Sequence, residues 1–233
     1  MKRKLVLFDI DGTLLLSRGA GRRALVAAMA DFLEAPAVAA ELVRFDGKTD
    51  PQIVAEMLAA AGQPRPEDPA RIAVVLDRYL ALLEAELARP DHATDVMPGV
   101  PELLAAVERD SDAVLGLLTG NVMAGARLKL RSAAIDPGRF VVGAYGSDHP
   151  ERTRLPAIAA ARAEEHFGRA PHGAEIVIIG DTPADVTCGA ALGARAIGVA
   201  TGSYSTAELA SAGAYAVFED LSLVAAVRDA IWS

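Results

Sequence analysis

Residues 6–14 read VLFDIDGTL, an apolar run that ends in two aspartates, a glycine and a threonine. The run Lys4–Phe8 is mostly apolar, which is typical of a strand in a parallel sheet that is covered on both faces. In an extended chain the side chains of Asp9 and Asp11 would face the same way, because the period of a strand is two. Two carboxylates at such a short separation repel each other unless a cation lies between them. The stretch therefore predicts a buried strand that ends at a cation-binding site.

Further apolar runs and amphipathic stretches alternate along the rest of the chain. The predicted strands are Lys4–Phe8, Ala113–Leu118, Phe140–Ala144, Glu175–Ile179, Ala194–Val199 and Ala214–Phe218. The predicted helices are Val100–Arg109, Met123–Ala133, Thr153–Phe167, Pro183–Leu192 and Leu221–Ile231. Repeated strand–helix units predict an α/β fold, here a Rossmann-like core built on a doubly wound parallel sheet.

Residues 16–95 interrupt this alternation, because they contain no clear strand. Their apolar spacing predicts helices over Gly21–Leu33, Pro51–Ala61 and Pro69–Ala88. We interpret the Ala-rich tract Ala35–Ala40 as compositional bias. The simplest organisation is a core of residues 1–15 and 96–233, with an inserted α-helical cap domain of residues 16–95. The two linkers are expected near Leu15–Gly19 and Pro90–Pro98.

The composition excludes several classes of protein. With 52% hydrophobic and 23% charged residues, the 233-residue chain is typical of a folded globular protein. The net charge of −8 argues against general nucleic-acid binding, because backbone phosphates would be repelled. Cys188 is the only cysteine, which rules out an internal disulfide and fits a reducing compartment. Asp9 and Asp11 end the first apolar run too early for a signal peptide. No apolar stretch reaches the ~18 residues of a spanning helix. We therefore expect a cytoplasmic protein with no membrane partner.

Ligands of open parallel sheets bind beyond the carboxyl ends of the strands, so the residues that follow each strand matter most. Polar groups follow four predicted strands: Asp9 and Asp11; Thr119, Gly120 and Asn121; Arg152 and Arg154; Asp181 and Asp185. Three carboxylates around one point suit a hard cation such as Mg²⁺. A single Asp after a buried strand is often only a helix cap or a turn residue. The whole set together favours a metal site.

Three of these segments resemble motifs of one known family. Residues 6–14 resemble the first motif of the haloacid dehalogenase superfamily, Leu117–Asn121 the second, and Ile178–Asp185 the fourth. Their order matches, and they span the core. The insertion after the first motif resembles the helical cap of the phosphatase branch, which includes phosphoglycolate phosphatases and β-phosphoglucomutases.

The resemblance implies a role for each residue. Asp9 would attack phosphorus and form an aspartyl-phosphate. Asp11 would act as general acid and base, and its main-chain carbonyl would bind the metal. Thr119 would hydrogen-bond a phosphoryl oxygen. The implied Mg²⁺ site comprises Asp9, Asp11, Asp181 and Asp185. The predicted substrate-binding residues are Gly120, Asn121, Lys48 and Thr49.

The third motif departs from the family pattern, which places a Lys there. Lys129 is the only Lys between the second and fourth motifs, and we expect it to have a surface or packing role. Arg152 is the predicted substitute, because its position before the following helix fits best and Arg binds phosphate in a bidentate manner. Arg154 stays open as the competitor.

These observations favour a Mg²⁺-dependent phosphohydrolase that acts on a small phosphorylated metabolite. Dehalogenases of the superfamily usually lack the second Asp of the first motif, so Asp11 argues against that chemistry. A phosphonate hydrolase would need a cap Lys that forms an imine. Lys48 is a formal candidate, but a cap loop that touches the substrate is the preferred interpretation. A phosphomutase is the alternative enzyme. A non-catalytic regulator that binds phosphorylated ligands is the alternative from another class.

Overall fold

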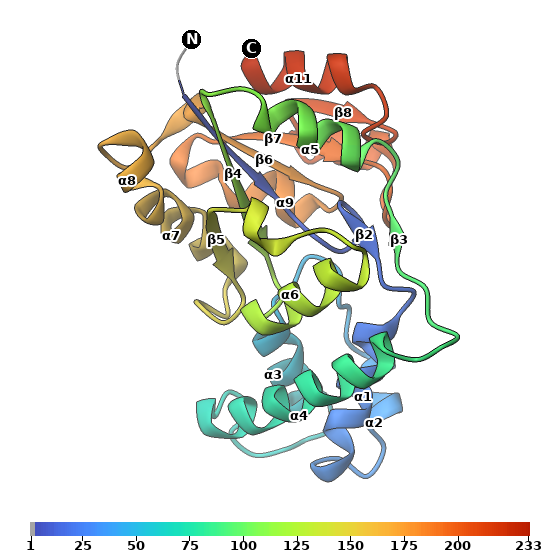
Figure 1. Cartoon of the computed structure of the whole chain (residues 1–233). Coiled ribbons are helices and arrows are strands. Elements are labelled where there is room, and N and C mark those ends of the chain that lie inside the picture. Colours follow the sequence, from blue (N-terminus) through green and yellow to red (C-terminus); the bar gives the residue numbers. More distant parts are fainter. Residues whose placement is uncertain (1–2) are drawn as a thin grey trace.

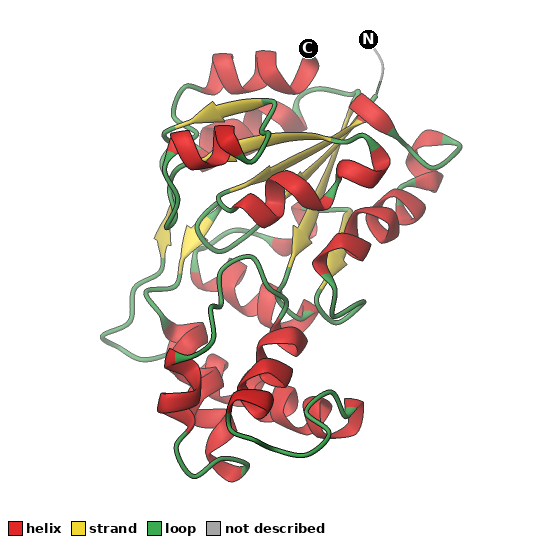
Figure 2. Ribbon diagram, turned by 180° about the vertical axis from the view of Figure 1, so that it is seen from behind, coloured by secondary structure: helices red, strands yellow, loops and turns green. Residues whose placement is uncertain are grey.

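A computed structural model of the chain describes residues 3–233 (Figures 1 and 2). Six strands form one sheet in the order β5-β4-β1-β6-β7-β8, and every neighbouring pair is parallel. They are β1 (Lys4–Phe8), β4 (Ala113–Thr119), β5 (Val142–Tyr145), β6 (Ile176–Gly180), β7 (Arg195–Val199) and β8 (Ala216–Phe218). The predicted fold class is confirmed, and each of these six strands lies where the apolar runs predicted it, with small shifts at the ends.

The strand order reverses beside β1, in the middle of the sheet. From β1 the chain moves outward to β4 and β5, and then crosses back to β6 on the other side of β1. The carboxyl ends of β1, β4 and β6 therefore meet at the point where a doubly wound sheet opens a crevice for ligands.

Helices cover both faces of the sheet, which explains why β1 is apolar throughout. Val6 and Phe8 pack in one cluster with α5 (Val100–Glu108), α6 (Met123–Ser132) and α11 (Val224–Trp232). Leu5 and Leu7 belong to a second cluster on the other face, with α7 (Leu155–Arg162) and α9 (Pro183–Cys188). The remaining core helices are α8 (Glu164–Phe167) and α10 (Thr206–Ser211).

Two predicted core helices are divided in the structure, and one helix was not predicted. Thr153–Phe167 consists of a 3-10 turn over Arg152–Arg154 followed by α7 and α8. The predicted helix Pro183–Leu192 is α-helical only as far as Cys188, the end of α9, and Gly189 follows. The helix α10 was missed, although Ser205 and Glu208 form a capping box at its start.

Residues 16–95 form helices joined by loops and have a hydrophobic cluster of their own. They hold α1 (Ala20–Ala28), α2 (Pro36–Glu41), α3 (Asp50–Ala60) and α4 (Pro69–Leu87). Figure 1 shows these helices as a separate body beyond the carboxyl ends of the strands, next to α6. Helix α2 occupies the tract that we interpreted as compositional bias, and Pro36 at its first position suits a helix start. The exact division into core and cap stays a prediction.

The two predicted linkers pair with each other instead of running separately. Leu15–Leu16 (β2) and Asp95–Val96 (β3) form a short antiparallel ribbon. Arg18 adds two hydrogen bonds to the carboxylate of Asp95, of 2.6 and 2.8 Å. No helix within residues 3–233 is both long enough and apolar enough to cross a membrane.

Candidate active site

Asp9 and Asp11 follow β1 and differ in burial and in the groups that they contact. Asp9 is buried, and its N–H donates to the carbonyl of Ile179 in β6 (2.9 Å). After Asp9 the chain turns, because the N–H groups of both Leu14 and Leu15 donate to the Ile10 carbonyl (2.9 and 3.1 Å). The side chain of Asp11 is 41% exposed and meets other partners. Both residues nevertheless line the same cavity.

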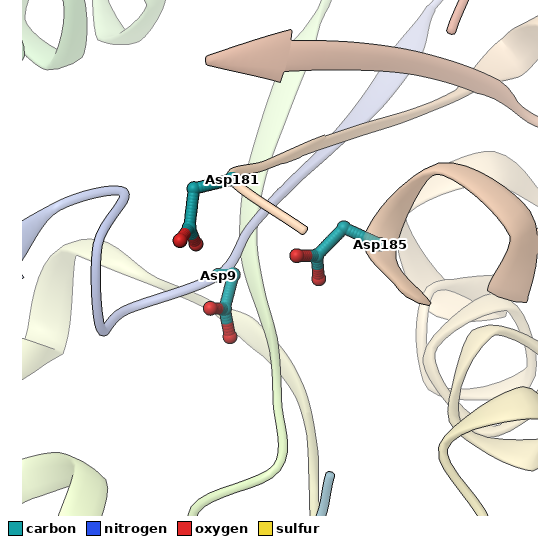
Figure 3. Close-up of side chains that lie close together, drawn as sticks. All are labelled: Asp9, Asp181 and Asp185. Carbon is teal, nitrogen blue, oxygen red and sulfur yellow. The ribbon is translucent and has the colours of Figure 1, made fainter. Parts of the chain in front are cut away.

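Asp9 belongs to a buried carboxylate cluster with Asp181 and Asp185, whose oxygens lie within 4.8 Å of one another (Figure 3). Burial and then the charge of Asp185 and Asp9 raise the pKa of Asp181. Burial also raises the pKa of Asp9, although Arg152 opposes the shift. The side chain of Asp11 is not one of these three. A place for Asp11 at the metal stays a prediction, and it rests on the main-chain carbonyl.

Asp181 is held from both sides by the chain around it. The hydroxyl of Thr13 donates to Asp181 Oδ1 (3.1 Å). Gly12 has a positive φ of 82°, and a Cβ added there would overlap the Asp181 carboxylate. Only glycine satisfies both the conformation and the space at this position. The glycine of the first motif thus lets the chain pass close to the carboxylate of the fourth motif.

Asp185 combines a capping role with a place in the cluster. It lies in the first turn of α9, where Asp185 Oδ2 accepts hydrogen bonds from Thr182 N–H (3.0 Å) and the Thr182 hydroxyl (2.7 Å). Thr182 Oγ1 accepts from the Asp185 N–H in return, which completes a capping box. The other oxygen, Oδ1, is paired with Arg152. The capping interpretation and the metal-site interpretation are therefore compatible.

Arg152 provides the positive charge of this cluster. Its side chain is 7% exposed, and Nη2 lies 3.1 Å from Asp9 Oδ1 and contacts Asp185. Burial alone would lower the pKa of Arg152, but Asp185 and Asp9 outweigh that effect and raise it. Arg154 is 68% exposed and pairs with Glu151 at 3.4 Å. Of the two candidates for the third motif, the structure places Arg152 at the site.

Lys129 also lies in the site, so the expectation of a surface or packing role is wrong. It is 5% exposed, and Nζ donates to Asp11 Oδ2 and to Asn121 Oδ1, both at 2.6 Å. Burial opposes the charge of Lys129, but Asp11 and Asp50 raise its pKa overall. The helical period contained a signal that we did not use. On α6, Lys129 shares the buried face with Ala126 and Leu130.

The second motif links these groups. Thr119 is fully buried, and its hydroxyl oxygen accepts from the backbone N–H (3.3 Å) and side-chain Nδ2 (2.8 Å) of Asn121. Asn121 Nδ2 also donates to Asp11 Oδ2 (2.8 Å). The Thr119 hydroxyl keeps its own hydrogen for a substrate oxygen. The Gly120 carbonyl accepts from the N–H of Asp50 in residues 16–95 (2.8 Å).

A cavity of about 320 Å³ opens between the carboxyl ends of the strands and residues 16–95. Core residues that line it include Asp9, Asp11, Thr119, Gly120, Asn121, Lys129, Arg152 and Asp181. The lining from residues 16–95 includes Arg18, Gly21, Arg22, Phe45, Lys48, Asp50 and Tyr79. Nearly all of the predicted site residues therefore surround one cavity.

The predicted cap residues Lys48 and Thr49 differ in their placement. Lys48 lines the cavity, and its ammonium group pairs with Glu56 of α3. Thr49 is fully buried; its hydroxyl donates to the Pro150 carbonyl (2.6 Å) and accepts from Gln52 N–H (3.3 Å) at the start of α3. The prediction that Thr49 contacts the substrate is therefore corrected: its side chain joins α3 to the core.

Asp50 was missed by the sequence reasoning, although it follows Thr49 directly. Its Oδ2 accepts from the backbone N–H of Val122 (2.9 Å), just after the second motif. Burial raises the pKa of Asp50 to about 6, while Lys129 and the Val122 N–H act in the opposite direction. Helix α3 is thus hydrogen-bonded to the core directly beside the cavity.

Comparisons with known proteins agree with this geometry. A family model described as HAD-hydrolase-like matches residues 151–224, which include Arg152 and the fourth motif. Over 222 residues the chain is 32% identical to phosphoglycolate phosphatase from Rhodospirillum rubrum, covering 94% of this chain and 88% of that protein. The chain belongs to the haloacid dehalogenase superfamily. It is an enzyme of the superfamily's phosphatase branch.

Two solved structures share the same fold. A predicted phosphoglycolate phosphatase from Haemophilus somnus has a TM-score of 0.69 and 19% identity, covering 98% of this chain and 99% of that one. CbbY from Rhodobacter sphaeroides, in complex with phosphate, has a TM-score of 0.68 and 21% identity, covering 94% and 95%. At these identities the likeness establishes the fold of this haloacid dehalogenase phosphatase and nothing finer.

Proposed function

We propose that this phosphatase hydrolyses the phosphomonoester of a small metabolite with Mg²⁺, through an aspartyl-phosphate on Asp9. One observation carries the proposal. The carboxylate of Asp9 lines the cavity, lies 3.1 Å from the guanidinium of Arg152, and belongs to a buried cluster of three carboxylates. This arrangement supplies a nucleophile, positive charge and oxygen ligands at one point.

In this mechanism Asp9 acts as the nucleophile in its ionised form. Arg152 favours that form by its charge, and it also orients the Asp9 carboxylate by contact. An oxygen of Asp9 attacks phosphorus while the ester oxygen of the substrate departs on the opposite side. The Thr119 hydroxyl donates a hydrogen bond to a phosphoryl oxygen, because its own acceptor sites face Asn121.

Asp11 acts as the general acid and then as the general base. Its carboxylate borders the cavity and is not part of the buried cluster, so it can reach the leaving oxygen while Asp9 holds phosphorus. Asp11 gives a proton to that oxygen as the first bond breaks. It then removes a proton from the water that hydrolyses the aspartyl-phosphate, which releases phosphate and regenerates Asp9.

The residues of the cluster fit a Mg²⁺ ion. Three buried carboxylates face one guanidinium. Burial, and then the charge of the neighbouring carboxylates, raises the pKa of Asp9 and of Asp181. Oxygen donors from Asp9, Asp181 and Asp185 are the ligand type that Mg²⁺ prefers, and the resemblance adds the Asp11 main-chain carbonyl. When bound, the ion would neutralise charge on the transferring phosphoryl group.

The size of the cavity and the names of the relatives suggest a first substrate. A volume of about 320 Å³ suits a small metabolite. The relative from Rhodospirillum rubrum is a phosphoglycolate phosphatase. We therefore propose 2-phosphoglycolate as the first compound in a panel of alkyl phosphates that also contains sugar phosphates and bisphosphates.

The test is phosphate release from this panel with Mg²⁺ and with EDTA, beside p-nitrophenyl phosphate as an activated aryl ester. We expect Mg²⁺-dependent turnover of at least one small alkyl phosphate. Release of no phosphate from any ester with Mg²⁺ would contradict the proposal. The phosphomutase alternative would be favoured by a different result: phosphate release is slow, a sugar phosphate acceptor suppresses it, and the phosphoryl group is transferred to that acceptor.

A further inference from the structure

Lys129 is a costly residue to bury, and the mechanism above does not use it. It is 5% exposed, and its ammonium group comes from α6 into the side of the cavity beside Asp11. Its neighbours on the buried face of α6 are the apolar residues Ala126 and Leu130. Removing a charge from water disfavours folding unless specific contacts compensate. A flexible apolar side chain would fill the same space at lower cost, so Lys129 requires an explanation.

The contacts of Lys129 converge on the proposed general acid. Lys129 Nζ and Asn121 Nδ2 both donate to the same oxygen, Asp11 Oδ2, at 2.6 and 2.8 Å. Lys129 Nζ also donates to Asn121 Oδ1 at 2.6 Å, which closes a triangle of three side chains. The triangle leaves Asp11 little rotational freedom, although its side chain is 41% exposed.

Gly21 of α1 provides the space for this ammonium group. Its φ is not in the left-handed region, so the turn of the chain does not demand glycine there. A Cβ added at Gly21 would lie 3.2 Å from Lys129 Nζ and 3.4 Å from Lys129 Cε. Glycine near the start of a helix is otherwise a poor helix former. The bare backbone of α1 therefore lets Lys129 reach Asp11 from the core.

We propose that Lys129 is a positioning residue that holds Asp11 in the orientation from which it protonates the leaving oxygen, with Gly21 as the space that permits it. This rests on the proposed function, because it assigns Asp11 as the general acid. Both donors bind Oδ2, so Oδ1 is the oxygen that transfers the proton. Lys129 itself does not contact the reacting phosphorus; it acts through Asp11.

The first test is Lys129→Met, which keeps an unbranched side chain one atom shorter and removes the charge and both hydrogen bonds. Leaving-group release is measured in a single turnover at saturating Mg²⁺, for the best alkyl phosphate of the panel and for p-nitrophenyl phosphate. A general acid matters most for a basic leaving group. We expect release from the alkyl ester to fall on the order of 10²-fold and release from the aryl ester to fall less than about 10-fold.

The second test uses a matched pair of substitutions that keep every charged group. Gly21→Ala pushes on Lys129, whereas Gly125→Ala in α6 adds a methyl group with ordinary contacts no closer than 3.5 Å. Both changes favour a helix. We expect Gly21→Ala to lower the alkyl-to-aryl rate ratio on the order of 3- to 10-fold with no fall in Tm. Gly125→Ala should leave the ratio unchanged.

The outcomes separate the two proposals. If the wild type hydrolyses no phosphate ester, the proposed function fails. If the wild type is active but Lys129→Met slows both esters by the same factor, Lys129 is merely structural and the positioning role is overturned. Equal rate ratios in Gly21→Ala and Gly125→Ala would overturn the assignment of Gly21. A crystal structure of Lys129→Met with Asp11 unmoved would contradict the proposal independently of activity.

Discussion

Two carboxylates that are two residues apart in the sequence lie in two different environments. Asp9 is buried with Asp181 and Asp185, where three carboxylates share one guanidinium. Asp11 is partly exposed and has an ammonium group and an amide as donors. The first region has three carboxylates for one guanidinium, whereas the second has two, Asp11 and Asp50, for the ammonium group of Lys129. Identical side chains can thus take different roles because their surroundings differ.

The comparison also indicates where the proposed Mg²⁺ would bind. A divalent cation is attracted where carboxylates outnumber their cationic partners, and this surplus is larger around Asp9 than around Asp11. The account therefore separates a nucleophile beside the ion from an acid and base held by Lys129. Each prediction below alters one of these two regions and asks whether the other responds.

The largest effect is expected from Asp9→Asn. An amide is a far poorer nucleophile, so turnover of every substrate should fall by about 10⁴-fold or more. Steady-state phosphate release measures the loss. Asp77→Asn, on the exposed face of α4, is the matched control and should retain wild-type activity. Near wild-type turnover in Asp9→Asn would rule out the covalent mechanism.

Removal of the metal should abolish nearly all activity. EDTA leaves three buried carboxylates with a single guanidinium, and the phosphoryl group would be repelled. Added Mg²⁺ should restore turnover, whereas Ca²⁺ should bind and support little, because its coordination is larger and looser. Isothermal titration gives binding and phosphate release gives activity. Full activity in a metal-free sample would contradict the separation of the two regions.

Arg152→Met should damage the first region and leave the second intact. The remaining partners are carboxylates without their cation, so the free energy of unfolding should fall by about 3 kcal/mol or more. Denaturant unfolding without Mg²⁺ measures this change. Arg154→Met is the matched control, because Arg154 is exposed and contacts only Glu151 among the carboxylates near it. If both substitutions lowered the free energy of unfolding equally, Arg152 would not be the residue that supplies the positive charge at the third motif.

The smallest effect concerns Asp50, which joins α3 to the core beside Lys129. Its pKa in the folded protein is raised to about 6 by burial, so the folded state holds the proton more tightly than the unfolded state does. Stability from this group is therefore present at low pH and is lost as pH rises from about 4 to 6. The loss is at most about 3 kcal/mol. At saturating Mg²⁺ the free energy of unfolding of the wild type should decline over this pH range. Asp50→Asn should remove the part of the decline that comes from Asp50. A decline that stays the same in Asp50→Asn would contradict the assignment.

Much of the core could be predicted, because its signals are local. Buried strands covered on both faces are continuous apolar runs, and the polar residues after them must meet at one edge of the sheet. The place of Arg152 just before α7 was predictable for the same reason. Lys129 could not be placed in this way, because a cationic residue on a helix normally faces water. The space beside Gly21, which is more than 100 residues away in the sequence, also contributes room for the Lys129 ammonium group.

The partners of Asp11 and the role of Thr49 depend on contacts that the local sequence does not contain. Lys129 and Asn121, which bind the Asp11 carboxylate, lie more than 100 residues further along the chain. Thr49 is polar and precedes a helix, which fits substrate binding and helix capping equally well. Its partner, the Pro150 carbonyl, comes from a distant loop. Long-range contacts decided each of these residues, and no local pattern contains them.

The most direct test of the separation between Asp9 and Asp11 is to trap the phospho-enzyme. Asp11→Asn and Asp9→Asn are each mixed with p-nitrophenyl phosphate at saturating Mg²⁺, quenched in acid and examined by peptide mass spectrometry. Asp11→Asn should accumulate phosphate on the peptide that contains Asp9, because the aryl group leaves without an acid while hydrolysis lacks its base. Asp9→Asn should carry no phosphate. A phosphorylated Asp9→Asn protein, or an Asp11→Asn protein that is slow and unlabelled, would contradict the account.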